Sequence, residues 1–154
     1  MPHINYAVDF TVEVFVVYEN KVLLRKHDKY GIWLSVGGHI EPNEDPIEAA
    51  IREVKEEVGL DITLIPTTEI LNIELDQYKH ILPPAFINRH RINKTHEHVT
   101  LTYFAKSNSD KVKQGDSEIS EGWKWFTLEE LEQLSEGITE TVKEYARTAL
   151  KTRK

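Results

Sequence analysis

The stretch of residues 37–60, GGHIEPNEDPIEAAIREVKEEVGL, constrains this chain more than any other part of its sequence. Seven of its residues are acidic, and three of these lie between Glu53 and Glu57. Like charges three or four residues apart destabilise a helix. Such crowding therefore indicates either an acidic face in contact with water or a site that binds a cation.

Residues 45–58 are predicted to form the helix that carries these charges. Asp45 is a suitable N-cap, Pro46 fits the first turn, and Gly59 ends the helix. At roughly 100° per residue, one face of this helix is apolar and is expected to pack on the core. That face consists of Ile47, Ala50, Ile51, Val54 and Val58.

The acidic face of the helix has the geometry of a site for a hard divalent cation. Glu53, Glu56 and Glu57 are spaced so that their side chains converge. Arg52 is four residues before Glu56 and can bridge to the cluster. Magnesium prefers oxygen ligands and also binds phosphate oxygens, so a partial set of carboxylates suits a phosphate ester bound together with the ion.

The whole stretch resembles the sequence signature of the Nudix hydrolase family. That signature is a glycine, five residues, a glutamate, seven residues, and then Arg-Glu-apolar-x-Glu-Glu-x-Gly-apolar. Every position is present at the right spacing, in Gly38, Glu44, Arg52, Glu53, Val54, Glu56, Glu57, Gly59 and Leu60. One departure is Val36, which stands where many members have a proline, and it affects the stiffness of the loop.

The resemblance implies the Nudix fold, an α+β architecture with a mixed β-sheet sandwiched between α-helices. It also implies hydrolysis of a diphosphate linkage in a nucleoside diphosphate derivative, with Mg²⁺ or Mn²⁺ as cofactor. By the same resemblance, Arg52 orients the glutamates and Glu44 supports the metal site or its waters. The implied metal ligands are a backbone carbonyl at Gly38 and the carboxylates of Glu53, Glu56 and Glu57.

The general base is not fixed by the signature, because family members place it in different parts of the chain. Three carboxylates are candidates here, namely Glu53, Glu97 and Glu121. Glu97 lies in HEHV, at the start of a predicted strand, where it is either an additional ligand or base, or a charge at the strand edge. Glu121 precedes the segment GWKWF.

Residues 76–95 have no clear periodicity and are predicted to form a long loop, a kind of segment that often carries function. The segment is basic in a chain of net charge −7. Arg89 and Arg91 are therefore interpreted as a clamp for phosphate or carboxylate groups, with a solvated loop as the alternative. Arg25 and Trp33 are further candidates for substrate contact. Aromatic residues that could stack on a flat group, although aromatics are more often core, are Tyr30, Trp33, Tyr78 and Phe86.

Three histidines near this segment raise the question of a zinc site. His96 and His98 are two residues apart on a predicted strand and share a face, and His90 is close in sequence. Their spacing matches no common zinc motif, and the acidic helix already supplies a magnesium-type site. Substrate contact or plain surface is therefore the preferred interpretation.

The rest of the sequence predicts strands around this helix within a single domain of residues 1–154. Trp123 and Trp125 share a strand face and are expected in the core. The strands are expected within residues 8–27, 30–40, 61–75, 96–107 and 122–127, and two further helices at Thr127 onward and at residues 138–151. The strand at residues 61–75 is expected to be interrupted near Pro66.

Composition excludes several functional classes. There is no apolar run of about 18 residues or more, which excludes a membrane-spanning helix. The net charge of −7 argues against broad nucleic-acid binding. The chain has no cysteine, so disulfides and thiolate chemistry are excluded. A cytoplasmic location is the default expectation, because the first residues lack the features of a signal peptide.

The main alternative is a module of the same fold that senses nucleotides without cleaving them. Such modules tend to lose signature glutamates, and all are present here. Isomerisation of prenyl diphosphates on this fold needs a reactive cysteine, which the chain lacks. The expected partner is a nucleotide or another small diphosphate compound. Its identity stays open, and so does the oligomeric state, including a homodimer.

Overall fold

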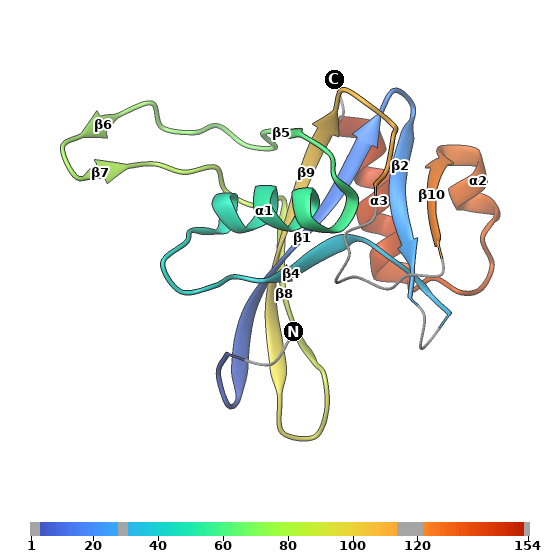
Figure 1. Cartoon of the computed structure of the whole chain (residues 1–154), viewed down its shortest axis with the longest axis horizontal. Helices are drawn as coiled ribbons and strands as arrows, with labels where there is room; N and C mark the ends of the chain where they lie inside the picture. The colour runs from blue at the N-terminus through green and yellow to red at the C-terminus, as the bar shows by residue number, and fades with distance from the viewer. Residues whose placement is uncertain (1–3, 28–30, 114–121, 153–154) are drawn as a thin grey trace.

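The computed structural model describes residues 4–27, 31–113 and 122–152, and a mixed β-sheet with helices on both faces lies at its centre (Figure 1). The main strand order is β10-β2-β1-β9-β5, with β3 paired to β2, β4 to β1, and β8 to β9. The pair of β1 and β9 is parallel and the other pairs are antiparallel. The strands are β1 (Val8–Tyr18), β2 (Lys21–Lys26), β3 (Trp33–Leu34), β4 (Val36–His39), β5 (Ile62–Leu64), β8 (Phe86–Arg91), β9 (Glu97–Ser107) and β10 (Gly122–Thr127).

The alternation of side chains along β1 divides the core into two layers. Val12, Val14 and Val16 pack in the layer that contains α1 (Pro46–Val58). Phe15 and Val17 pack in the other layer, against residues of α2 (Leu128–Gln133) and α3 (Glu140–Thr152). The predicted sandwich of a mixed sheet between helices is therefore confirmed.

Helix α1 begins and ends where the sequence predicts. The side chain of Asp45 accepts a hydrogen bond from the backbone N–H of Glu48, whose side chain accepts one from the backbone N–H of Asp45. Gly59 closes the helix with a φ of +68°, a conformation that suits glycine. The predicted core face is wrong at Ile51, which is 46% exposed, whereas Ala49 is buried. The reason is that Glu53 and Glu57 also turn toward the sheet, and this rotates Ile51 outward.

One prediction about the middle of the chain is wrong, and another holds only in part. The expected loop at residues 76–95 contains strand β8, which pairs with β9 along its whole length. The strand expected at residues 61–75 is interrupted near Pro66, as predicted, but it is regular only at β5 and at β6 (Glu74–Leu75). Strand β6 pairs with β7 (Tyr78–Lys79) in a hairpin that extends away from the body of the protein (Figure 1). Most residues of β8 are exposed and several are polar. The strand therefore lacks the alternation of apolar and polar residues that would identify it from sequence.

The C-terminal part follows the sequence pattern closely. Thr127 caps α2, and its hydroxyl accepts a hydrogen bond from the backbone N–H of Glu130, as the capping sequence predicts. Trp123 and Trp125 pack against the core layer of α1 and are only partly buried. None of the helices formed by the described residues is both long and apolar enough to cross a membrane.

Candidate active site

The close approach of α1 to β4 sets the position of Glu53. Gly38 pairs with Val12 of β1 and faces α1. A methyl group added at Gly38 would lie only 2.5 Å from Cδ of Glu53 and 2.8 Å from its Oε2. A glycine is therefore required here so that the carboxylate can lie directly against the backbone of β4.

Arg52 is the centre of a hydrogen-bond network that holds the acidic residues in place. Its Nε and Nη2 donate to the two carboxylate oxygens of Glu44, at 3.0 and 2.6 Å. Its Nη1 donates to Glu53 at 3.0 Å and to Glu56 at 3.2 Å. Nη2 also donates to the backbone carbonyl of His39, at 3.0 Å. One guanidinium thus ties α1 to β4 and to the loop between them.

The network sets the charge states of its members. The bidentate hydrogen bond from Arg52 lowers the pKa of Glu44, and the same contact raises the pKa of Arg52. Burial raises the pKa of Glu53, and the hydrogen bond and charge of Arg52 only partly offset this effect. Glu44 is therefore a fixed anion that anchors the arginine, whereas Glu53 holds its negative charge less readily.

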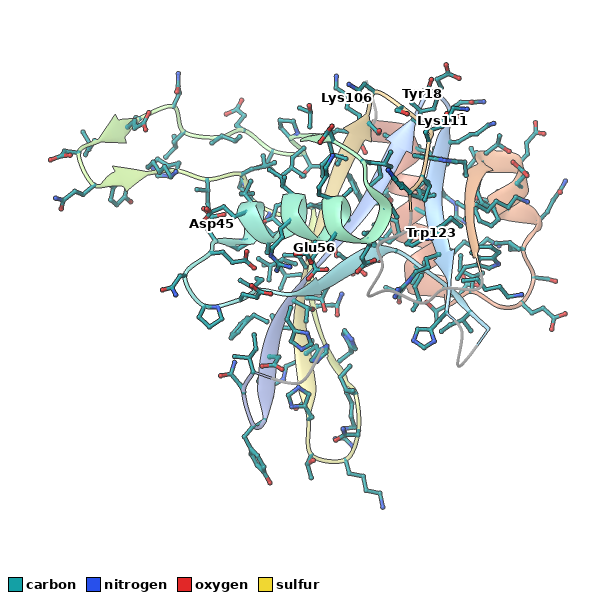
Figure 2. All side chains as sticks on the ribbon, viewed as in Figure 1. Tyr18, Asp45, Glu56, Lys106, Lys111 and Trp123 are labelled. Atoms are coloured by element: carbon teal, nitrogen blue, oxygen red, sulfur yellow. The ribbon has the colours of Figure 1, made fainter. Side chains whose placement is uncertain are left out.

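Glu53 and Glu57 form a buried pair of carboxylates on the sheet side of α1. Their residues are 5% and 3% exposed, and the two side chains are hydrogen-bonded to each other. Two carboxylates in such contact need a proton or a cation between them. Glu56, by contrast, has a side chain 57% exposed, and Figure 2 shows it on α1 close to where β4 passes the helix. The donors are all oxygens, so the residues fit a divalent cation of the magnesium type.

The structure joins Glu97 to one of the arginines predicted to bind substrate. Nη2 of Arg89 lies 2.9 Å from Oε1 of Glu97, and this contact lowers the pKa of Glu97 and raises that of Arg89. Arg91 is directly opposite Glu97 in the pairing of β8 with β9. The register places all three on the face of the sheet that carries Gly38 and α1. The candidate base and the candidate clamp therefore share one patch.

The other candidates for substrate contact lie in different places. Arg25 has its guanidinium carbon 5.8 Å from the ring centre of Trp123, on the α1 face. Trp33 lies in the opposite layer, where its ring meets Phe126 edge to face at 5.0 Å. Phe86 stacks on Tyr145 in that same layer, and Tyr78 is on the exposed hairpin. Two further candidates lie outside the described residues, namely Tyr30 and Glu121.

Three polar residues that the sequence reasoning did not select lie on the face of the sheet opposite α1. Glu13 is mostly buried and accepts hydrogen bonds from Thr102 at 2.7 Å and Ser35 at 3.1 Å. Burial raises its pKa, and the two hydroxyls offset only part of the effect. Asp9 and His39 are also buried there. The sequence does contain a signal for these residues, because Asp9 and Glu13 are acidic residues within the mostly apolar segment that forms β1.

The surface interpretation of His96 is wrong. The residue is 3% exposed, and its Nδ1 lies 2.9 Å from the backbone carbonyl oxygen of Tyr6. A histidine in this environment fixes the segment before β1 rather than contacting a substrate. His90, on β8, is exposed as predicted.

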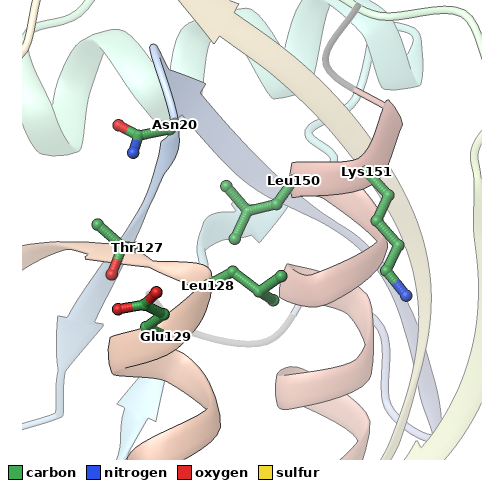
Figure 3. Close-up of a pocket in the computed structure, with 6 residues that line it drawn as sticks. All are labelled: Asn20, Thr127, Leu128, Glu129, Leu150 and Lys151. Atoms are coloured by element: carbon green, nitrogen blue, oxygen red, sulfur yellow. The ribbon is translucent and has the colours of Figure 1, made fainter.

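One pocket adjoins the acidic site. It has a volume of about 460 Å³ and includes Glu41, whose carboxylate is 3.6 Å from Nη1 of Arg52, together with Phe10, Ile40 and Leu101. Another pocket, of about 370 Å³, lies between the β1–β2 turn and helices α2 and α3 (Figure 3). None of the signature residues lines that second pocket, so it is separate from the site on α1.

Comparisons with known proteins match nearly the whole chain. A family profile described as the NUDIX domain matches residues 9–147. A hydrolase of the NUDIX family from Clostridium perfringens has a solved structure that superposes with a TM-score of 0.86, at 35% identity, over 95% of this chain and 98% of that one.

Two curated relatives are more distant. The RNA pyrophosphohydrolase of Gluconacetobacter diazotrophicus is 26% identical over 70% of this chain and 64% of its own length. The asymmetrical bis(5'-nucleosyl)-tetraphosphatase of Mus musculus is 25% identical over 75% of this chain and 69% of its own. The chain thus spans less than two thirds of the first relative.

Proposed function

Because the chain belongs to the Nudix hydrolase family, we propose that it hydrolyses a diphosphate linkage in a nucleoside diphosphate derivative, with Mg²⁺ or Mn²⁺ bound at its acidic helix. The observation that carries the proposal is the buried pair of Glu53 and Glu57 beside Gly38, held in place by Arg52. Arg52 partly offsets the charge of Glu53, and burial of a second carboxylate beside it is costly unless a further cation offsets its charge.

The residues that would hold the ion are Glu53, Glu56, Glu57 and the backbone carbonyl at Gly38. A divalent ion bound there would neutralise phosphate oxygens, orient the leaving group and make a water molecule more acidic. Arg52 keeps three carboxylates at fixed distances, and Glu44 prevents the guanidinium from turning toward the substrate. The signature residues therefore act together as a rigid set of oxygen donors.

Glu97 is the group that we propose as the general base. The hydrogen bond from Arg89 lowers its pKa, so that at neutral pH the carboxylate is ionised and able to accept a proton. It lies on the same face of the sheet as Gly38. Along β9, Glu97 is four residues from the position level with Gly38, which is about 14 Å at about 7 Å for every two residues. Arg91 is paired opposite Glu97, but the ion pair with Glu97 is formed by Arg89. Arg91 is therefore proposed to bind the phosphate chain.

The part of the substrate that does not react is proposed to lie in the pocket beside the site. Phe10 is 51% exposed there and offers an apolar surface on which a flat group can stack. Arg25 is proposed as a further contact on this face, whereas Trp33 packs on Phe126 in the opposite layer and is not part of this proposed contact. The names of the two curated relatives describe cleavage of phosphate chains on nucleotides or RNA, which supports a nucleotide as the substrate class.

The experiment that tests the proposal is a panel of diphosphate compounds incubated with the protein and Mg²⁺, with the products identified. The expected result is metal-dependent release of two phosphate-bearing products from at least one nucleotide. Glu57→Gln should lower kcat on the order of a hundredfold or more, because it removes one charged ligand. Binding of nucleotides without turnover by the parent protein would favour the sensor module instead.

A further inference from the structure

On the face of the sheet opposite α1, one carboxylate and two imidazoles from three different strands come together. Asp9 lies on β1, His98 is beside it on β9, and His39 ends β4 opposite Thr11. One ligand atom from each of the three lies within 4.8 Å of the others. Asp9 and His39 are buried and His98 is half-buried, so the group is largely protected from water.

The spacing of these atoms suits a tetrahedral metal ion. Zinc binds histidine nitrogens and carboxylate oxygens at about 2.0–2.2 Å, so that two of its ligand atoms lie about 3.3 Å apart. Nε2 of His39 is already 3.1 Å from Oδ2 of Asp9. The rings of His39 and His98 meet edge to face with their centres 5.0 Å apart. The ligand atom of His98 lies within 4.8 Å of those of Asp9 and His39, so the three have to move closer together to share one ion.

Asp9 is held in the way that ligating carboxylates are held in metal sites. The backbone N–H of Asn5 donates to its Oδ1 at 2.6 Å, and that of Ile4 donates to its Oδ2 at 3.1 Å. Nε2 of His96 lies 3.3 Å from the same Oδ2. Nδ1 of His96 must carry a hydrogen, because its partner, the carbonyl oxygen of Tyr6, can only accept. Nε2 can therefore donate to Asp9 only in the form of the ring that carries a hydrogen on both nitrogens. Partners of this kind orient a ligand and are a usual part of metal centres.

The donor atoms of the group favour an ion of the zinc class. A carboxylate oxygen beside imidazole nitrogens is a donor set for zinc and related ions, whereas magnesium prefers oxygens alone.

We propose that Asp9, His39 and His98 form a second metal site, for a divalent ion of the zinc class, with His96 orienting Asp9. It is distinct from the site on α1, because it lies on the other face of the sheet and contains nitrogen donors. An ion bound there cross-links β1, β4 and β9 at one end of the sheet. Its role is to stabilise the strand that carries Gly38.

His39 connects the two sites. Its side chain belongs to the proposed zinc-class site, while its backbone carbonyl accepts a hydrogen bond from Nη2 of Arg52, the centre of the acidic network. Fixing the ring of His39 therefore also restrains the backbone at the end of β4, next to Gly38. The proposed ion acts on the acidic site through this backbone and contacts no part of it.

The experiment is a titration of the full-length protein with Co²⁺, after removal of metals with a chelator and in the presence of excess Mg²⁺. Mg²⁺ occupies oxygen sites, and Co²⁺ bound by imidazoles absorbs visible light. One equivalent of Co²⁺ should bind with a visible spectrum, and Zn²⁺ should displace it. His98→Gln and, independently, His39→Gln should weaken Co²⁺ binding on the order of a hundredfold, with circular dichroism used to verify the fold.

Two control variants separate this site from its surroundings. His90→Gln alters a neighbouring exposed histidine, whose ring centre is 5.9 Å from that of His98, and should leave Co²⁺ binding unchanged. Glu57→Gln alters the acidic helix and should also leave it unchanged. Zn²⁺ should raise the thermal midpoint of the parent and both controls but not of His98→Gln. The proposal is overturned if the parent binds no Co²⁺ under these conditions, if folded His98→Gln and His39→Gln bind it like the parent, or if Glu57→Gln abolishes the binding.

Discussion

Gly38→Ala is the substitution that tests most directly how the acidic site is built. A methyl carbon at this position would lie 2.5 Å from Cδ of Glu53, whereas ordinary van der Waals contact begins at 3.4 Å. The backbone of β4 is held by its pairing with β1, so the flexible side chain of Glu53 has to move. The required displacement of the carboxylate is roughly 1 Å, which is the difference between those two distances.

A displacement of this size is enough to disable the site. The hydrogen bond between Arg52 and Glu53 is 3.0 Å long, and moving the carboxylate by about 1 Å away from its partner breaks it. Misplacement of a catalytic group by about 1 Å reduces rates on the order of a hundredfold. We therefore expect Gly38→Ala to lower kcat/KM by about this factor. The thermal midpoint should fall by a few degrees only, because the clash is with the end of a side chain.

The assay is steady-state hydrolysis of the best diphosphate substrate with saturating Mg²⁺, together with thermal unfolding. Gly122→Ala on β10 is the matched control, because a methyl group there meets nothing within 4 Å, and it should behave like the parent. Glu53→Asp shortens the side chain by one methylene and should make the alanine at position 38 less destabilising. A double-mutant cycle on the unfolding free energy should show a coupling of about 0.5–3 kcal/mol between the two positions. Full activity of Gly38→Ala, with no coupling to position 53, would refute the reasoning.

Three further predictions concern groups outside the acidic helix. Arg89→Ala removes the largest cause of the lowered pKa of Glu97, so if Glu97 is the base, the acid limb of the kcat/KM profile should move to higher pH; an unmoved limb would assign the base elsewhere. Arg91→Ala should raise KM about tenfold and leave kcat nearly unchanged, with a KM that depends less on ionic strength than that of the parent; equal salt dependence would make Arg91 a solvated surface residue. Glu13→Gln should raise the thermal midpoint at pH 7 but not at pH 4. Burial raises the pKa of Glu13 above its ordinary 4.5, so the folded state binds the proton more tightly than the unfolded state. The parent therefore loses stability as pH rises through the folded-state pKa. Equal thermal midpoints of the parent and Glu13→Gln at both pH values would contradict this sign.

The parts of the site that could be predicted from sequence are those that depend on one helix. The convergence of Glu53, Glu56 and Glu57 and the contact of Arg52 with Glu56 follow from helical spacing, and the caps of α1 follow from local turn chemistry. The division of the molecule into a sheet between helices also followed from local patterns. Each of these features is decided within a few residues, so no knowledge of the pairing between strands was needed.

The wrong predictions concern features that depend on contacts between distant parts of the chain. Ile51 was placed in the core because helical spacing puts it on the apolar face, but the approach of α1 to the sheet turns Glu53 and Glu57 inward instead. Strand β8 was assigned to a loop because its exposed residues give no alternating pattern, and only its pairing with β9 defines it. Asp9 and His39 are 30 positions apart in the sequence and meet because β4 folds back on β1. Tertiary contacts decide all of these positions.

The register in which β8 pairs with β9 also changes the roles inferred for Arg89 and Arg91. From sequence, Arg89 and Arg91 were equivalent members of one clamp, and Glu97 was an independent base. The pairing of β8 with β9 places Arg89 within 2.9 Å of Glu97, so Arg89 cannot offer all its donors to a phosphate and also keep this contact. Substitution of Arg89 should therefore change both KM and the pH profile, whereas substitution of Arg91 should change KM alone. The two arginines share a strand face and a charge, but the register makes one a partner of the proposed base and leaves the other to bind the substrate.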